Sequence, residues 1–179
     1  IGVVAIDTIG LMRKFVLDIR QSASRKWGLD HLMIHATHNH EGPDTQGLWG
    51  PGLFESGIND DYMRELKGTI LSVVESAISN LEPAEMSIAR IATDPRTPIK
   101  DKRKPIVIDE DIRALLFRRP DQSVIGTVVN FGIHVELAWD KNLLLTSDIA
   151  GYLRSGISEG IYYDEELRMP GLGGTTLWL

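Results

Sequence analysis

The sequence of 179 residues contains no cysteine. Disulfide bonds and thiolate metal ligands are therefore excluded, so any metal must be held by histidine, carboxylate or tyrosine. No run reaches the roughly 20 apolar residues that a transmembrane helix requires. Acidic residues also outnumber basic residues, with 25 Asp and Glu residues against 19 Lys and Arg residues. This balance predicts no nucleic-acid partner, since such partners select basic surfaces.

The residue pattern at each end of the sequence is that of a strand cut short. Residues 1–7 and 175–179 are short apolar runs with β-branched residues, which are typical of strands. We therefore expect residues 1–179 to form a single partial domain that is truncated at both ends. A signal peptide is not visible, and a fragment of this kind carries no information about one.

Hydrophobic periodicity predicts an α/β fold. Apolar residues recur at helical spacing in residues 8–27, 60–81 and 148–159. Strands are expected at 1–7, 31–37, 84–92, 113–119, 124–134 and 175–179. The hairpin turn at 120–123 breaks a purely parallel pattern, so we expect a mixed β-sheet flanked by helices. The polar segment 38–58 is long enough for a functional loop.

Histidine is concentrated in one segment. Four of the five histidines are His31, His35, His38 and His40, and the fifth is His134. Neutral imidazole is a good zinc ligand, and groups that follow strands are where α/β sheets bind ligands. His38 and His40 follow a predicted strand and His134 ends another, so we expect a metal site there. His31 and His35 are expected to be structural.

The His-x-His pattern at His38 and His40 is shared by unrelated metallohydrolases. Metallo-β-lactamase-like enzymes place Asp-His at the positions that Gly42 and Pro43 occupy here, so that family fits poorly. Amidohydrolase barrels also carry His-x-His, but the predicted hairpin does not suit a (β/α) barrel.

Three longer segments resemble the neutral/alkaline ceramidase family. Residues 37–44 read Thr-His-Asn-His-Glu-Gly-Pro-Asp, similar to that family's Thr-His-Thr-His-Ser-Gly-Pro motif. Residues 130–136 resemble its strand that ends in a metal-binding histidine. Residues 142–152 resemble its Asn-x-Leu-Ile-Ser-x-Asp-x-x-Gly-Tyr segment. The three motifs occur in the expected order, and the resemblance covers nearly the whole chain, as the N-terminal part of a larger catalytic domain.

The resemblance implies a zinc site and roles for particular residues. His38 and His134 match the first two zinc ligands, and His40 matches the active-site histidine that contacts the substrate or the reacting oxygen. Arg103 is our choice for the family's catalytic arginine, with Arg96 as the runner-up. The remaining zinc ligands, a Glu and a Tyr, are expected beyond residue 179, so this fragment should bind metal weakly.

The implied activity is zinc-dependent hydrolysis of an amide bond by metal-activated water, as in the conversion of N-acylsphingosine to sphingoid base and fatty acid. Asn39 and Glu41 replace the family's Thr and Ser. That departure keeps open a same-fold metallohydrolase acting on another amide or ester. A non-catalytic binding homologue is the other alternative.

Other expectations concern the surroundings of the site. A carboxylate such as Asp7 or Asp44, or a backbone carbonyl, should orient His38 through its second ring nitrogen. Asp148 is expected to cap a helix. Leu48 and Trp49 are placed to meet an apolar substrate chain, in a loop that is either a shaped lid or a flexible segment.

The remaining expectations concern partners and location. The predicted partner is a small-molecule or lipid amide, with interfacial access to membrane lipid. Family resemblance implies export to the periplasm or the medium. The oligomeric state is left open.

Overall fold

The computed structural model describes residues 1–93, 99 and 101–179. The chain folds into two compact units. The first comprises residues 1–82 and 135–150, and the second comprises residues 83–134 and 151–179. Within the described residues, no helix has the length and apolar character needed to cross a membrane. The expectation of one partial catalytic domain stays a prediction.

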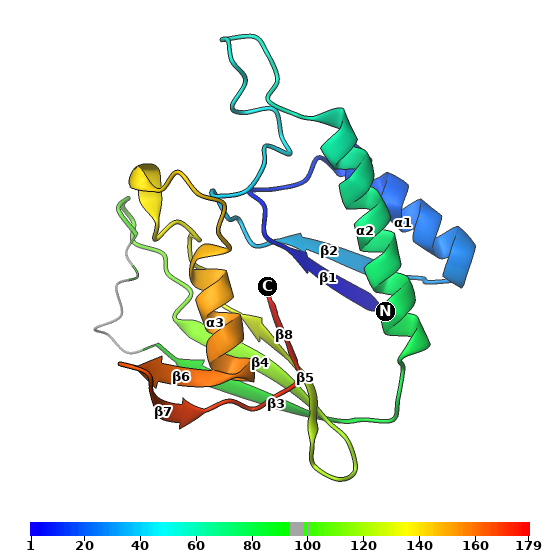
Figure 1. The fold of residues 1–179 in the computed structure, drawn as a ribbon, viewed down its shortest axis with the longest axis vertical. Helices are drawn as coiled ribbons and strands as arrows, with labels where there is room; N and C mark the ends of the chain where they lie inside the picture. The colour runs from blue at the N-terminus through cyan, green and yellow to red at the C-terminus, as the bar shows by residue number, and fades with distance from the viewer. Residues whose placement is uncertain (94–98, 100) are drawn as a thin grey trace. The chain divides into compact units, whose positions relative to one another are not determined.

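The first unit is built on two parallel strands and two helices (Figure 1). Strands β1 (Gly2–Ile6) and β2 (Leu32–Ala36) pair in parallel, and helices α1 (Arg13–Trp27) and α2 (Asp60–Ser79) pack on them. Burial of apolar side chains provides the main driving force for this packing. The fully packed core consists of Val4, Ile19, Ala23, Leu32, Ile70 and Val74.

The ends of the two helices follow local chemistry. Gly28 ends α1 in the left-handed conformation with φ of 63°, where glycine has no Cβ penalty. The Asn59 side chain caps α2 by accepting hydrogen bonds from the backbone N–H groups of Asp61 and Tyr62. Both residue types are typical of the helix ends that they occupy.

Helix α1 begins at Arg13, five residues later than its periodicity predicts. The preceding segment is held by the loop that follows β2. The Thr8 and Thr45 hydroxyl groups lie 2.7 Å apart, and Thr45 donates a 2.6 Å hydrogen bond to the carbonyl of Gly10. These long-range hydrogen bonds stabilise a non-helical path that local periodicity cannot reveal.

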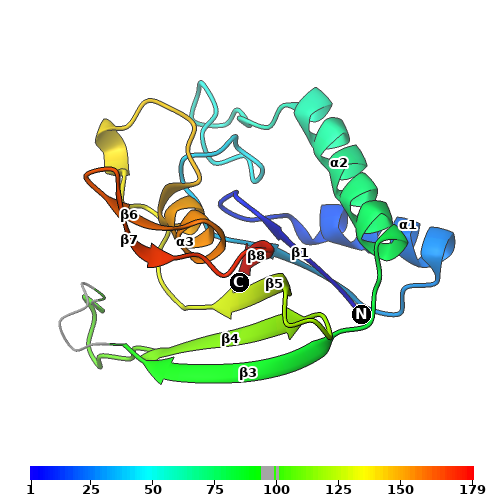
Figure 2. The ribbon, with the colours of Figure 1, turned by 60° about the horizontal axis from the view of Figure 1, so that its bottom comes forward.

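The second unit contains the mixed sheet that the sequence predicts. Its strand order is β3-β4-β5-β8, with two antiparallel pairs followed by a parallel pair between β5 and β8 (Figure 2). The bounds are Glu85–Ala92 for β3, Asp111–Arg118 for β4, Val124–Asn130 for β5 and Thr175–Trp178 for β8. The α/β class and the mixed pairing are confirmed, although β1 and β2 form a separate sheet.

Two boundaries differ from expectation in this part of the chain. Strand β5 ends at Asn130, so His134 lies four residues beyond the strand and not at its end. A hairpin of β6 (Gly160–Tyr163) and β7 (Glu166–Pro170) occupies a segment in which the sequence predicts no strand. Its two-residue turn has positive φ at Asp164 and Glu165, which is the geometry of a tight hairpin turn but not its usual Asn-Gly sequence.

The connection from β5 to β6 passes through two helical segments. A short 3-10 helix, η1, covers Trp139–Lys141, and α3 covers Asp148–Ser158. Residues 135–150 of this connection belong to the first unit. They carry much of the candidate site.

Candidate metal centre

A single backbone pairing within the first unit joins the two segments that carry the site. Asn39, three residues after β2, forms an isolated parallel bridge with Val135. The N–H of His40 donates to the carbonyl of Val135 at 3.4 Å. Val135 is fully buried, so the pairing is shielded from water. Because His134 is covalently joined to Val135, its backbone is held beside the segment that carries His38 and His40.

Asn39 fixes this pairing with its side chain. The residue is 2% exposed. Its Nδ2 group donates to the carbonyl of Thr146 at 2.7 Å, and its Oδ1 accepts from the N–H of Glu41 at 3.0 Å. A buried amide is costly unless it is hydrogen-bonded, so these two bonds favour the arrangement in which the segment after β2 lies beside Thr146. In the sequence, Asn39 stands out only as a departure from a motif.

The protonation of His38 is set by its backbone partner. Its Nδ1 lies 2.8 Å from the carbonyl oxygen of Ile9. A carbonyl can only accept, so Nδ1 carries the proton and Nε2 presents its lone pair. This is the arrangement in which a histidine can ligate a metal through Nε2. The group that orients the His38 ring is therefore a backbone carbonyl. Asp44 does not have this role.

His40 faces the same point. Its Nε2 lies 3.4 Å from the Nε2 of His38, and its Nδ1 lies 3.5 Å from a carboxylate oxygen of Glu136. The ionised carboxylate favours a proton on Nδ1 of His40. Two Nε2 lone pairs would then face each other, and they need a cation or a shared proton between them.

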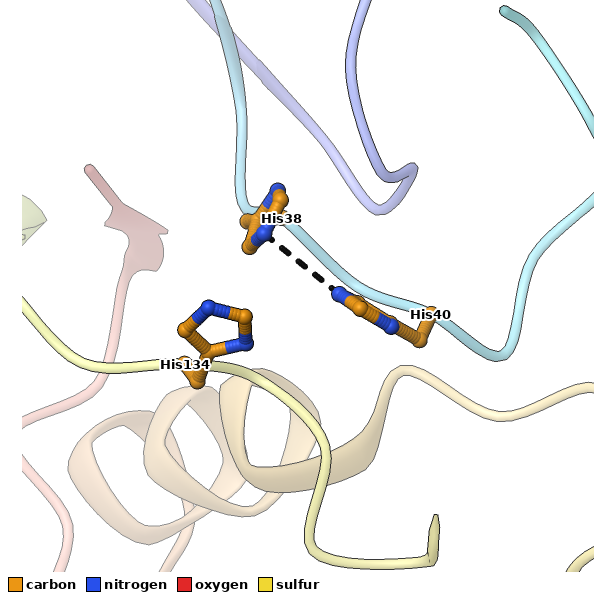
Figure 3. A group of neighbouring side chains, drawn as sticks. All are labelled: His38, His40 and His134. Carbon is orange, nitrogen blue, oxygen red and sulfur yellow. Dashed lines mark hydrogen bonds between the residues drawn. The ribbon is translucent and has the colours of Figure 1, made fainter. Parts of the chain in front are cut away.

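One ring nitrogen from each of His38, His40 and His134 lies within 4.8 Å of the others (Figure 3). Three imidazoles are a donor set that suits zinc and other late transition metals. The residues present therefore fit a metal ion. The sequence placed His38 and His134 as ligands and His40 as a catalytic group, and all three lie in one cluster.

Asp44 organises the loop that follows the histidines. Its carboxylate accepts hydrogen bonds from the backbone N–H groups of Gln46, Gly47 and Trp49, at 2.7 to 2.9 Å. Burial alone would raise the pKa of Asp44, but these backbone donors outweigh it and hold that pKa below its usual value. The carboxylate is thus a loop-forming group.

The loop itself has a specified shape. A Cβ at Gly50 would lie 1.6 Å from the carbonyl oxygen of Glu55, and one at Gly57 would lie 2.5 Å from that of Trp49. Only glycine permits these close backbone approaches. Of the two expectations for this loop, the shaped one agrees with these contacts.

A cavity of about 370 Å³ opens beside His40, entirely within the first unit. Its lining residues are His40, Glu41, Trp49, Glu136, Trp139, Asp140 and Asn142. Trp49 was expected to face a substrate. Trp139 and Asp140 were missed because no periodicity or motif marks them, and Asn142 stands in the third motif without a role assigned to it.

Backbone strain gathers around the site. Among the described residues, three of the six non-glycine positions with positive φ lie here, namely His38 at 66°, Trp139 at 54° and Asp148 at 51°. Such conformations are uncommon for residues with a Cβ and persist where surrounding contacts enforce them. All three lie in the segments joined by the Asn39 pairing.

Arg103 belongs to the second unit. Its side chain is 91% exposed, and its Nε lies 3.8 Å from a carboxylate oxygen of Asp101. The runner-up, Arg96, lies outside the described residues. The assignment of a catalytic arginine stays a prediction.

Asp148 is the first residue of α3 and is 3% exposed. Its carboxylate accepts a 2.7 Å hydrogen bond from the N–H of Ala138 and another from the N–H of Ile149. Burial would raise the pKa of Asp148, but backbone N–H donors, including that of Leu137, outweigh burial and lower it. The carboxylate therefore ties the segment after His134 to the start of α3.

This arrangement predicts an acid-sensitive contribution to stability. Because the folded pKa of Asp148 is lower than the unfolded value of about 3.9, the ionised group stabilises the fold above that value. The contribution disappears as pH falls through the folded pKa. We expect Asp148→Asn to lower the free energy of unfolding at pH 7 by about 1–3 kcal/mol, measured by chemical denaturation.

The difference between wild type and Asp148→Asn should shrink as the pH is lowered toward the folded pKa. Asp30→Asn, at an exposed position, provides the control. A difference that stays constant across this range would contradict the assignment.

Comparison with known proteins agrees with this fold. No family model matches the sequence, and no curated protein sequence matches it. Among solved structures, neutral ceramidase from Pseudomonas aeruginosa is similar with a TM-score of 0.73 at 16% identity. A second structure, described as ceramidase complexed with C2, gives a TM-score of 0.75 at 18% identity.

Each alignment covers 98% of this chain and 29% of the ceramidase chain. The chain thus spans less than a third of the length of these neighbours. The resemblance expected from the three motifs is confirmed at the level of fold: the chain has the fold of one part of a neutral ceramidase.

Proposed function

We propose that this chain forms part of a zinc-dependent hydrolase that cleaves an amide bond, as the ceramidase resemblance implies. The observation that carries the proposal is the convergence of three imidazole nitrogens within 4.8 Å. The similarity in fold to two ceramidase structures supports it independently of the histidines. An N-acylated sphingoid base is the substrate that the family resemblance suggests.

His38 and His134 would hold the zinc ion, together with ligands outside residues 1–179. When bound, zinc supplies Lewis acidity and activates water near neutral pH. The Ile9 carbonyl fixes the tautomer of His38 that a ligand requires. Both histidines are positioned by the segments that Asn39 joins.

His40 would act on the substrate. Its Nε2 faces His38, and Glu136 lies beside its Nδ1. With a proton on Nε2 as well as on Nδ1, the imidazolium could donate a hydrogen bond from Nε2 to the negative charge that develops on the carbonyl oxygen, and electrostatic stabilisation of this kind is often the largest contribution to acyl transfer. The same geometry would also let His40 serve as a third ligand, and the two roles make different predictions.

Arg103 remains our candidate for an additional substrate contact. Its exposed guanidinium can form paired hydrogen bonds with an oxyanion. We further propose that the intact protein is exported and reaches its substrate at a lipid surface.

The zinc assignment predicts the metal content of the full-length protein. Wild-type protein purified with excess zinc should retain near-stoichiometric metal and hydrolyse a short-chain ceramide. His38→Ala and His134→Ala should each lose both, because each removes a ligand. His31→Ala is a matched control at an exposed histidine outside the cluster, and should retain both. Wild-type protein that retains no zinc would overturn the metallohydrolase assignment.

The role of His40 is separable from that of the ligands. If His40 contacts the reacting oxygen, His40→Ala should keep its zinc and lose about 10²–10³-fold in kcat. Zinc content by plasma emission spectrometry and steady-state kinetics measure the two quantities on the same sample. Loss of zinc equal to that of His38→Ala would instead assign His40 as a ligand and contradict the oxyanion role.

A further inference from the structure

The cavity beside His40 has a chemical character of its own. Two of its seven lining residues are tryptophans, Trp49 and Trp139, and the ring centroid of Trp49 lies 6.5 Å from that of His40. A molecule in this cavity would therefore lie next to indole rings and next to the imidazole proposed to act on the substrate. The cavity volume of about 370 Å³ suits part of a small ligand.

The charged residues of the wall have one sign. Glu41, Glu136 and Asp140 line the cavity, and no Lys or Arg occurs among its described lining residues. Glu136 lies beside His40 and is assigned to orienting that ring. Glu41 and Asp140 remain as the carboxylates that a ligand would meet.

Glu41 is held in place. The Nδ2 group of Asn142 donates to its Oε2 at 2.6 Å, and its backbone N–H is bound by Asn39. A positioned carboxylate loses less side-chain entropy on binding than a mobile one. A carboxylate with tryptophan rings in the same wall favours an alkylammonium group, because both ion pairing and cation–π attraction act on it.

One residue of the cavity wall differs from the residue at the same position of the ceramidase motif, and the difference changes the charge of the wall. Glu41 stands where the motif has Ser, directly after His40. The change replaces a neutral hydroxyl group with an anionic carboxylate. A neutral alcohol can only donate a hydrogen bond to this carboxylate, whereas an ammonium group adds an ion pair to the hydrogen bond.

We propose that this cavity binds an ammonium group of the substrate, so that the natural substrate is an amide that carries a free amine close to the scissile bond. This inference rests on the proposed amide hydrolysis for its reaction. The cationic binding site itself stands on the cavity, the two indoles and Glu41.

The test compares two amides with the same acyl chain in the full-length, zinc-loaded protein. N-octanoyl ethylenediamine carries an ammonium group, and N-octanoyl ethanolamine carries a neutral hydroxyl group in the same position. We expect kcat/KM to favour the cationic amide by about tenfold, the ratio that about 1.4 kcal/mol supplies. Glu41→Gln should abolish most of this preference and retain an oxygen acceptor for Asn142. Glu55→Gln, outside the cavity, should leave the ratio unchanged.

A binding experiment separates this inference from the reaction. Calorimetric titration of the His38→Ala protein with butylammonium and with butanol needs no hydrolysis. Butylammonium should bind more tightly than butanol, and Glu41→Gln or Trp139→Leu should each weaken it. If neither amide is hydrolysed but this pattern holds, the proposed function fails and the cationic site stands. Equal binding of both probes, or no effect of Glu41→Gln, would overturn the cationic site.

Discussion

The candidate site depends on one buried pairing between distant parts of the chain. Asn39 bridges to Val135 and donates to the carbonyl of Thr146, 107 residues away along the sequence. The backbone of residues 39 and 40 joins the segment after β2 to the segment before η1, and the Asn39 side chain joins it to the segment after η1. The positions of His38 and His40 relative to the 135–150 segment follow from it. The Asn39 amide is a hydrogen-bonded polar group at a buried point of this connection, and its loss would leave the carbonyl of Thr146 and the N–H of Glu41 without that partner.

Much of the local structure was predictable because local chemistry determines it. Apolar periodicity identified the helices, and Asn59 and Gly28 are residue types that favour the helix ends at which the structure places them. The late start of α1 was not predictable, because it depends on Thr45 contacting Thr8 and Gly10 across the fold. The β6–β7 hairpin was missed because its turn uses Asp164 and Glu165 in place of the usual glycine.

The sequence could predict which residue type would bind a metal at this site. It could not predict which groups would hold those residues in position. A cluster of histidines after a strand indicated metal chemistry without any coordinates. The partner of His38 is the backbone carbonyl of Ile9. Every residue has a backbone carbonyl, so the residue type gives no sign of which one will bind. Asp44 was one of the carboxylates expected to orient His38. Its oxygens instead accept hydrogen bonds from backbone N–H groups of its own loop. The cavity is lined by loop residues, and only the three-dimensional fold shows that these residues lie together.

We propose that imidazoles of this cluster bind zinc. X-ray absorption spectroscopy at the zinc edge of the full-length, zinc-loaded protein tests it most directly, because imidazole rings give characteristic multiple scattering beyond the nearest neighbours. Zinc held by these histidines should give that scattering, with nitrogen at about 2.0–2.1 Å from the metal. A spectrum that fits oxygen ligands alone, or a protein that retains no zinc at all, would contradict it.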